Sequence, residues 1–308
     1  MWSKKGVILN IDNYNDWMIS HACVPTALKI NETTIRIYYA PRNKEGKSIP
    51  TYFDVDALNP AIVKYIHNEP ILELGELGTF DDDGIMPCSA VRITESQIYL
   101  YYVGWNPSVS VPYRNSIGLA ISNDNGATFK RAFQGAIVER NKYEPFFTAS
   151  PCVLREDDIW HLWYASSTGF VIVNTKPEPL YEIKYAHSKN GIDWMRPNIT
   201  CIPPSEKFQC TARPSVIKED GVYKMWFTYR GSFDYRDGKD SYRIGYAESL
   251  DGVTWKREDE KSGIVISESG WDSAMQTYPC VIKTDEKTWL FYNGNGFGKT
   301  GIGFAEWI

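Results

Sequence analysis

The 308-residue sequence has no run of about 18 consecutive apolar residues, which a membrane-spanning helix requires. Its first residues, Met1–Gly6, include two lysines and lack the apolar centre and small-residue cleavage site of a secretory signal. The net charge of −5 leaves no excess of basic residues for a nucleic-acid footprint. We therefore expect a cytoplasmic protein with no membrane span and no nucleic-acid partner.

The sequence also lacks the spacings that bind metals or phosphate cofactors. Its six cysteines form no C-x-x-C pair, and there is neither a glycine-rich phosphate loop nor a nucleophile elbow. Cys88, Cys152 and Cys280 each follow a proline directly, where equivalent segments carry Thr26 or Ser215. We interpret this position as a small-residue packing position on an inner strand, and we expect reduced thiols, no metal site and no cofactor.

What the sequence does contain is a repeat with a spacing of 62 to 65 residues. A proline followed by a short apolar segment occurs five times along the chain, and such a fixed period is typical of repeat architectures. These five positions, called the repeat prolines below, are Pro25, Pro87, Pro151, Pro214 and Pro279.

Each repeat contains four strand signals, A to D, marked by alternation and by β-branched or aromatic residues. Strand A follows the proline, strand B is an aromatic run such as Ile98–Tyr102, and three C–D turns carry the Asx-Gly pair of tight hairpins. The fifth repeat stops at Ile308 after strand C, whereas a spare strand lies at Trp2–Leu9. The sequence therefore predicts an all-β, five-bladed β-propeller in a single domain, residues 1–308, whose ring is closed by the N-terminal strand in the last blade.

This topology places the D–A and B–C connections on one face of the propeller. The B–C connections are expected to be long, irregular loops, as at Ser166–Pro179 and Tyr229–Ser241. These loops hold most of the unusual carboxylates, arginines, amides and aromatics, and irregular loops on a rigid scaffold are where function concentrates. Polar groups of these kinds bind sugar hydroxyls and aromatic rings stack on sugar faces, so the mixture indicates a carbohydrate ligand.

Nearly the whole chain resembles the five-bladed propeller glycosidases, a group with arabinanases, xylosidases, fructosidases and mannoside phosphorylases. The resemblance is carried by Phe80–Pro87, Ala212–Pro214, Gly270–Ser273 and the Asp-Gly-x-x-Trp turns. The chain is most similar to a branch associated with bacterial surface-polysaccharide genes, which implies a carbohydrate-active enzyme. In the characterised glycosidases a catalytic acid commonly lies one or two residues before the blade proline, but no acid occupies those positions here.

Cleavage of a glycosidic bond typically uses two carboxyl groups on opposite sides of the bond. The catalytic candidates in the face loops are Asp83, Glu144 and Asp272. Each has a structural alternative, since Asp83 could cap a turn, Glu144 could pair with an arginine and Asp272 could brace its own loop. The neighbouring Asp81 and Asp82 are expected to be solvated.

The candidates for substrate binding lie on the same face. Arg213 leads into an inner strand and needs either a structural carboxylate or an anionic ligand, and Arg114 and Arg230 are weaker candidates of this kind. His21 occupies in the first repeat the position that Asp83 holds in the second, where it could act as an acid or base or serve structurally. The remaining candidates stand at strand ends, where they could stack on or hydrogen-bond to a sugar: Trp105, Tyr229, Tyr278 and Asn293.

Together with the resemblance, these residues favour a glycoside hydrolase-like enzyme acting on a bacterial surface polysaccharide sugar or its precursor. A glycosyltransferase or phosphorylase would keep the scaffold and use arginines for phosphate. A sugar-binding protein without turnover is a third hypothesis, favoured by the missing acids before the prolines. The expected partner in each case is a carbohydrate or a sugar phosphate.

Overall fold

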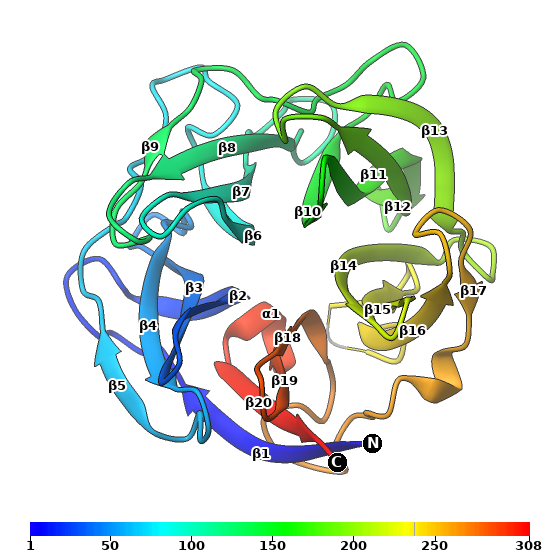
Figure 1. Cartoon of the computed structure of the whole chain (residues 1–308). Helices are drawn as coiled ribbons and strands as arrows, with labels where there is room; N and C mark the ends of the chain where they lie inside the picture. Colours follow the sequence, from blue (N-terminus) through cyan, green and yellow to red (C-terminus); the bar gives the residue numbers. More distant parts are fainter. Residues whose placement is uncertain (237) are drawn as a thin grey trace.

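Five antiparallel sheets of four strands each surround a central axis (Figure 1). The computed structural model describes residues 1–236 and 238–308. Every sheet is a blade that runs from an inner strand beside the axis to an outer strand at the rim. The prediction of a five-bladed β-propeller is confirmed.

The blades are numbered in chain order. The first contains β2 (Ser20–Asn31), β3 (Thr34–Arg42), β4 (Thr51–Asp56) and β5 (Val63–Ile66). The second contains β6 (Ile85–Arg92), β7 (Ile98–Gly104), β8 (Ser116–Ser122) and β9 (Lys130–Arg131). The third contains β10 (Thr148–Glu156), β11 (Ile159–Val173), β12 (Lys176–Ser188) and β13 (Met195–Ile202). The fourth contains β14 (Cys210–Glu219), β15 (Val222–Arg230), β16 (Arg243–Ser249) and β17 (Lys256–Arg257).

The fifth blade joins the two ends of the chain, with β18 (Thr277–Lys283), β19 (Thr288–Asn293), β20 (Ile302–Trp307) and β1 (Trp2–Leu9). β1 pairs with β20 from Trp2 opposite Trp307 to Leu9 opposite Ile302. The Met1 amino group donates a hydrogen bond of 2.9 Å to the Ile308 carbonyl. The predicted closure is therefore confirmed, and it pairs an edge of β20 that would otherwise be open.

Helices are short and lie between strands: η1 (Asp259–Lys261) and α1 (Asn295–Gly298). In the described ranges, no helix has both the length and the apolar character needed to cross a membrane.

The inner strands begin before the repeat prolines, so the expectation that strand A follows the proline is corrected. Each inner strand breaks its pairing register at or beside the proline. The residue before the proline has a positive φ in four blades, between 49° and 57° at Val24, Ser150, Arg213 and Tyr278. This left-handed conformation is rare for such side chains, and a bulge of this kind re-aims a side chain. The bulges turn these four residues toward the axis.

One residue after each repeat proline, or one position later, forms an inter-blade hydrogen bond, and the five bonds together form a ring around the axis. The small residue after the bulge bonds to the backbone of a neighbouring inner strand, so every pair of adjacent blades is linked. The sulfur of Cys152 and the hydroxyl of Ser215 accept from the amides of Val216 and Val281, at 3.4 and 2.8 Å. The other links are Cys280 to Ala27, Ser89 to Val153 and Thr26 to Pro87. The predicted packing position thus also forms the inter-blade hydrogen bond. In the second blade this bond is formed by Ser89, one residue after the predicted Cys88.

A buried acid connects strands B and D in three blades. Its carboxylate accepts a hydrogen bond from a tyrosine of strand B and pairs with a base of strand D. The carboxylate of Asp272, for example, lies 2.8 Å from Lys4 Nζ and 3.0 Å from the Tyr292 hydroxyl. The prediction that Asp81 is solvated is wrong, because it is buried in such a contact. We call these contacts the blade braces: Asp81–Tyr102–Arg131, Glu144–Tyr164–Arg196 and Asp272–Tyr292–Lys4.

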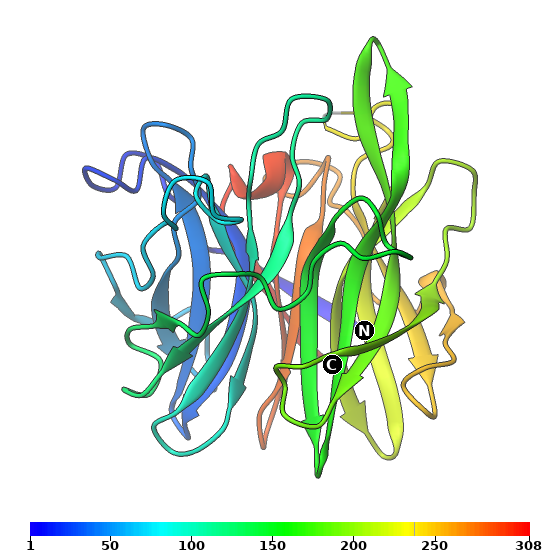
Figure 2. The same ribbon diagram turned by 90° about the horizontal axis from the view of Figure 1, so that it is seen from above.

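The B–C connection of the third blade is a regular structure, contrary to expectation. β11 and β12 stay paired out to Val173 opposite Lys176. The resulting two-stranded ribbon projects beyond the other connections at one end of the axis, where α1 also lies (Figure 2). The backbone accommodates Gly169 with a register shift, and the pairing continues with Pro179 opposite Phe170 and Pro177 opposite Ile172.

Replacing Ser215 by alanine tests the inter-blade ring. Ser215→Ala leaves the buried Val281 amide without its acceptor, so we expect the free energy of unfolding to fall by about 1 to 2 kcal/mol, measured by urea denaturation. Ser215→Cys is the matched control, since cysteine sulfurs accept the equivalent bond in two other links. An equal loss in both variants would show that the hydrogen bond is not the source of the stability.

Replacing Asp272 by asparagine tests a blade brace. Burial opposes ionisation of Asp272, but hydrogen bonds from Lys4, Ser267 and Gln276 hold its pKa below the ordinary range. A depressed folded-state pKa stabilises the protein above the unfolded pKa of about 3.9, and this contribution is lost as the pH falls through the folded value. We expect Asp272→Asn to cost about 2 to 3 kcal/mol at pH 7 and progressively less below pH 4.

The control for this experiment is Asp285→Asn. Asp285 pairs with Lys29 on the surface and is 78% exposed, so its loss should leave the unfolding midpoint close to that of the wild type. A cost of Asp272→Asn that did not change with pH would contradict the role of the ionised carboxylate.

Candidate active site

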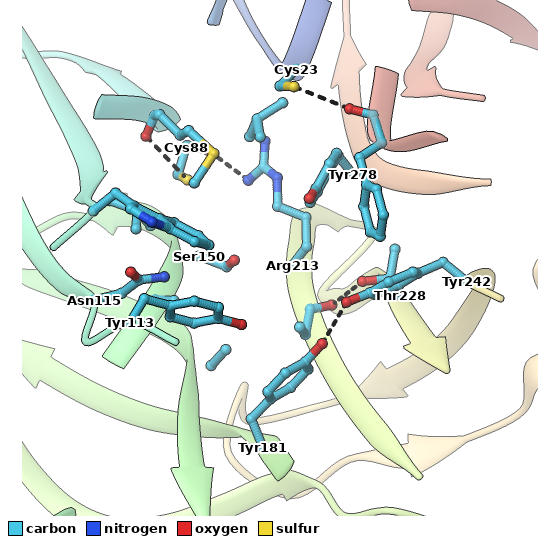
Figure 3. Close-up of a pocket in the computed structure, with 18 of the residues that line it drawn as sticks. Cys23, Cys88, Tyr113, Asn115, Ser150, Tyr181, Arg213, Thr228, Tyr242 and Tyr278 are labelled. Atoms are coloured by element: carbon cyan, nitrogen blue, oxygen red, sulfur yellow. Dashed lines mark hydrogen bonds between the residues drawn. The ribbon is translucent and has the colours of Figure 1, made fainter. Parts of the chain in front are cut away.

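The axis of the propeller holds a cavity of about 400 Å³. Tyr181, at the base of the ribbon, and Phe297 of α1 contribute to its wall, which places the cavity at the end of the axis shared by the ribbon and α1 (Figure 2). Each blade also contributes the residue that precedes its repeat proline (Figure 3). These five residues are Val24, Met86, Ser150, Arg213 and Tyr278, of which Figure 3 labels the last three.

The charged residues that the structure describes in the cavity wall are all arginines: Arg42, Arg213, Arg230 and Arg236. No carboxylate lines this cavity among the described residues. Arg236 pairs with Glu178 at 2.7 Å, whereas no carboxylate of the described chain lies within 4 Å of the other three guanidinium groups. Among the described residues the cavity wall therefore carries more positive than negative charge, although the Glu178 carboxylate that pairs with Arg236 also attracts Arg230.

Arg213 spans the axis. It belongs to the fourth blade, but its Nη1 donates to the Cys88 carbonyl at 2.7 Å and its Nη2 donates to the Pro25 carbonyl at 3.0 Å. These acceptors lie in the second and first blades, which are not adjacent to the fourth (Figures 1 and 3). Its Nε is buried and has no hydrogen-bond partner.

Arg230 lies in a cluster of tyrosines. Its Nε donates to the Tyr181 hydroxyl at 2.8 Å, and its guanidinium lies 3.9 Å from the ring centroid of Tyr235. The hydroxyls of Tyr181 and Tyr242 are 2.5 Å apart. Burial raises the pKa of Tyr181 well above its ordinary value, so its hydroxyl stays neutral and does not cancel the charge of Arg230.

Aromatic rings form the wall on the side of the second blade. The rings of Trp105 and Tyr113 have centroids 4.1 Å apart, and Tyr113 and Phe147 follow at 5.6 Å. All three line the cavity. An apolar wall beside polar donors suits a sugar ring, which presents carbon–hydrogen faces and hydroxyl edges.

A second cavity of about 190 Å³ adjoins the first. The two cavities share Arg42, Met86 and Trp105 in their walls, and the second also contains Asp83. The backbone amide of Asp83 donates to the Trp105 carbonyl at 3.2 Å, and its carboxylate lies 3.2 Å from Lys47 Nζ. Asp83 thus stands beside the shared wall, as the one carboxylate that lines either cavity in the described ranges.

The structure brings together part of the predicted site. Trp105, Arg213, Arg230 and Tyr278 line the axial cavity and Asp83 lines the adjoining one. The other two catalytic candidates, Glu144 and Asp272, are 2% and 0% exposed, lie in the blade braces and do not contribute to either cavity wall.

Four predicted binding residues lie outside both cavity walls: His21, Arg114, Tyr229 and Asn293. Burial and the nearby charges of Arg42 and Lys299 lower the pKa of His21 to about 4, so it is neutral at pH 7. Asn293 is fully buried and its side chain bonds to the backbone of Val24, Ala22 and Gly301. These contacts make Asn293 a support of the first bulge.

Sequence reasoning missed several wall residues, notably Arg42, Tyr113, Tyr181 and Tyr242. Arg42 lies at the end of strand B in the first blade. Trp105 and Arg230, which were predicted, lie at or directly after the end of strand B in their own blades, so a comparison of equivalent positions could have found Arg42. Tyr113 and Tyr242 come from B–C connections, where no periodic signal marks the direction of a side chain, and Tyr181 lies in β12, in a segment just after the stretch that was expected to be a loop. The described residues contain no group of three or more His, Cys, Asp or Glu side chains placed to hold a metal ion.

No family model matches the chain. An uncharacterised protein of Mycobacterium tuberculosis is 36% identical over 305 residues, which cover 99% of this chain and 98% of the relative. A β-1,2-mannobiose phosphorylase of Thermoanaerobacter is 30% identical over 146 residues, or 45% of each chain.

Solved structures share the fold over nearly the whole length. A glycoside hydrolase superimposes with a TM-score of 0.75 at 17% identity, covering 98% of this chain and 90% of its own. A member of a mannoside phosphorylase family that also contains hydrolases of β-1,2-mannosidic linkages has a TM-score of 0.71 at 13% identity, covering 100% and 93%. The chain thus belongs to one family with the mycobacterial protein, and it shares the five-bladed β-propeller fold with the glycoside hydrolase and mannoside phosphorylase-family structures.

Proposed function

We propose that this protein is a carbohydrate-active enzyme of the phosphorylase type, which transfers a glycosyl unit between a sugar acceptor and inorganic phosphate. The observation that carries the proposal is the combination of one carboxylate, Asp83, with an arginine-lined axial cavity. The partial similarity to a mannobiose phosphorylase supports the same class.

The number of carboxylates separates phosphorolysis from hydrolysis. A hydrolase typically needs one carboxyl group as acid and a second as base or nucleophile. Phosphate is already an anion at neutral pH and attacks without a protein base, so a single acid is sufficient. Glu144 and Asp272 could serve as the second carboxylate only by leaving buried contacts, and we assign both of them to the scaffold.

In the proposed step the glycosyl unit occupies the axial cavity and the leaving sugar occupies the adjoining one. Asp83 donates its proton to the glycosidic oxygen as the bond from that oxygen to the anomeric carbon breaks. An oxygen of hydrogen phosphate bonds to the anomeric carbon, and the proton that phosphate gives up returns to Asp83. Arg42, which lines both cavities, and Lys47, which contacts Asp83, are placed to hold phosphate at the junction.

The identity of the substrate is proposed from the sequence resemblance. A bacterial surface polysaccharide sugar, or its cytoplasmic precursor, is the substrate that the resembling branch implies. Reversal of the same step, with a sugar 1-phosphate as donor, would extend such a sugar, and this direction is part of the proposal.

Asp83→Asn tests the proposed role of the acid. We expect wild-type protein incubated with a panel of sugar 1-phosphates and sugar acceptors to release inorganic phosphate, and the variant to lose at least about 100-fold in kcat. Asp16→Asn is the control, because Asp16 is an exposed acid of the equivalent loop in the first blade and lines neither cavity. Equal activity of Asp83→Asn and wild type would overturn the assignment.

Phosphate dependence tests the reaction class. Oligosaccharide cleavage by the wild type should require added phosphate and yield a sugar 1-phosphate, detected by mass spectrometry. Cleavage that proceeds equally well in phosphate-free buffer would instead establish a hydrolase. Sugar binding by calorimetry with no product in either direction would establish a binding protein.

A further inference from the structure

We infer that the glycosyl unit held in the axial cavity itself carries an oxyanion, either a carboxylate or a phosphate ester, which is recognised by Arg213 and Arg230. This inference rests on the proposed function for the placement of the sugar, and it names the class of sugar. Inorganic phosphate at the junction is a separate anion.

Uncompensated charge is the first observation. Arg213 and Arg230 are 2% and 1% exposed, and no described carboxylate lies within 4 Å of either guanidinium, although Glu178 attracts Arg230 from farther away. A buried ion without a counter-ion in contact is costly, because its lost hydration is not replaced by an opposite charge. The contacts of these arginines are carbonyl and hydroxyl groups, which solvate a cation without neutralising it. An anionic ligand would supply the missing charge.

The unused hydrogen-bonding capacity of the wall is the second observation. Arg213 Nε is a buried donor without a partner, on a side chain whose two outer nitrogens are held across the axis. Asn115, which also lines the cavity, has a buried Oδ1 without a partner. A donor and an acceptor left free in one wall fit a ligand with both an oxyanion and a hydroxyl.

Arg213 is also held in a costly backbone conformation. Its φ of 49° lies in the left-handed region, immediately before Pro214. A residue before proline normally adopts an extended backbone, and strained positions of this kind concentrate at functional sites. The bulge directs the Arg213 side chain across the axis. A neutral hydrogen-bond donor would be sufficient to link the blades there, so the permanent charge of an arginine points to a further role.

The position of the two arginines separates their ligand from the phosphate of the proposed reaction. Arg213 and Arg230 line only the axial cavity and not the adjoining one. Asp83 lines only the adjoining cavity, and Arg42 lines both. The bond that reacts lies beside Asp83, so the axial arginines contact a part of the glycosyl unit away from the anomeric carbon. A volume of about 400 Å³ admits one sugar ring with a charged substituent.

Calorimetric titration of the wild type in phosphate-free buffer tests the inference. Matched pairs differ only in the charged group: galacturonate against galactose, glucuronate against glucose, and mannose 6-phosphate against mannose. We expect at least one anionic member to bind about 10- to 100-fold more tightly than its neutral partner, because charge-assisted hydrogen bonds are the strong ones. A preferred sugar acid identifies a carboxylate, and a preferred sugar phosphate identifies an ester.

Arg213→Met should remove this preference, so that the anionic and neutral members of a pair bind with similar affinity. Arg140→Met is the charge-matched control, since Arg140 is exposed and lines neither cavity. Asp83→Asn should bind the anionic sugar as tightly as the wild type while losing turnover, so that failure of the reaction and failure of this inference give different results.

Three outcomes would overturn the inference. Neutral and anionic partners could bind equally, inorganic phosphate alone could bind the axial cavity and displace the anionic sugars, or Arg213→Met could keep the full preference. If circular dichroism shows that Arg213→Met does not fold, the wild-type comparison within each pair decides the question without a variant.

Discussion

The break in strand register at the repeat prolines, accompanied in four of the five blades by a left-handed backbone before the proline, is the constraint on which the axial cavity depends. An extended backbone at these positions would continue the alternation of the inner strand and send the next side chains into the blade. The bulge instead turns one residue per blade toward the axis, where Ser150, Arg213 and Tyr278 meet (Figure 3). The inter-blade hydrogen bonds directly after the bulge anchor the same strands to one another. Cavity and ring therefore arise from one local feature that is repeated around the axis.

The acidic residues of the blade braces lie buried inside the blades and not in the cavity walls. Three acids lie in the blade braces, where tyrosine and a base satisfy each carboxylate inside the sheet. The positions that face the axis carry no acid, and one of them carries Arg213. The result is a fold shared with solved glycoside hydrolases around a cavity whose described charged residues are arginines, which is the reason for preferring a reaction that involves anions.

The candidate site could be predicted only in part. Asp83, Arg213 and Tyr278 were found because they lie close to a repeat proline, whose position relative to the axis is the same in each blade. Glu144 and Asp272 were placed on the right loops, but the loop does not reveal whether a side chain turns outward to a ligand or inward to a tyrosine. Arg42 and Tyr181 were missed because residues remote in sequence surround them, and no pattern along the chain reports such neighbours.

The period of the prolines, the aromatic strands and the missing last strand were sufficient to specify a five-bladed ring closed by its N-terminus. These features are local or strictly repeated, and a repeat that buries its faces only against copies of itself has few ways to assemble. Tertiary structure alone decided the charge of the cavity, the pairing of the buried acids and the regular ribbon of the third blade. Each of these depends on which side chains from different blades come within a few ångströms, and that follows from the packing of the whole ring.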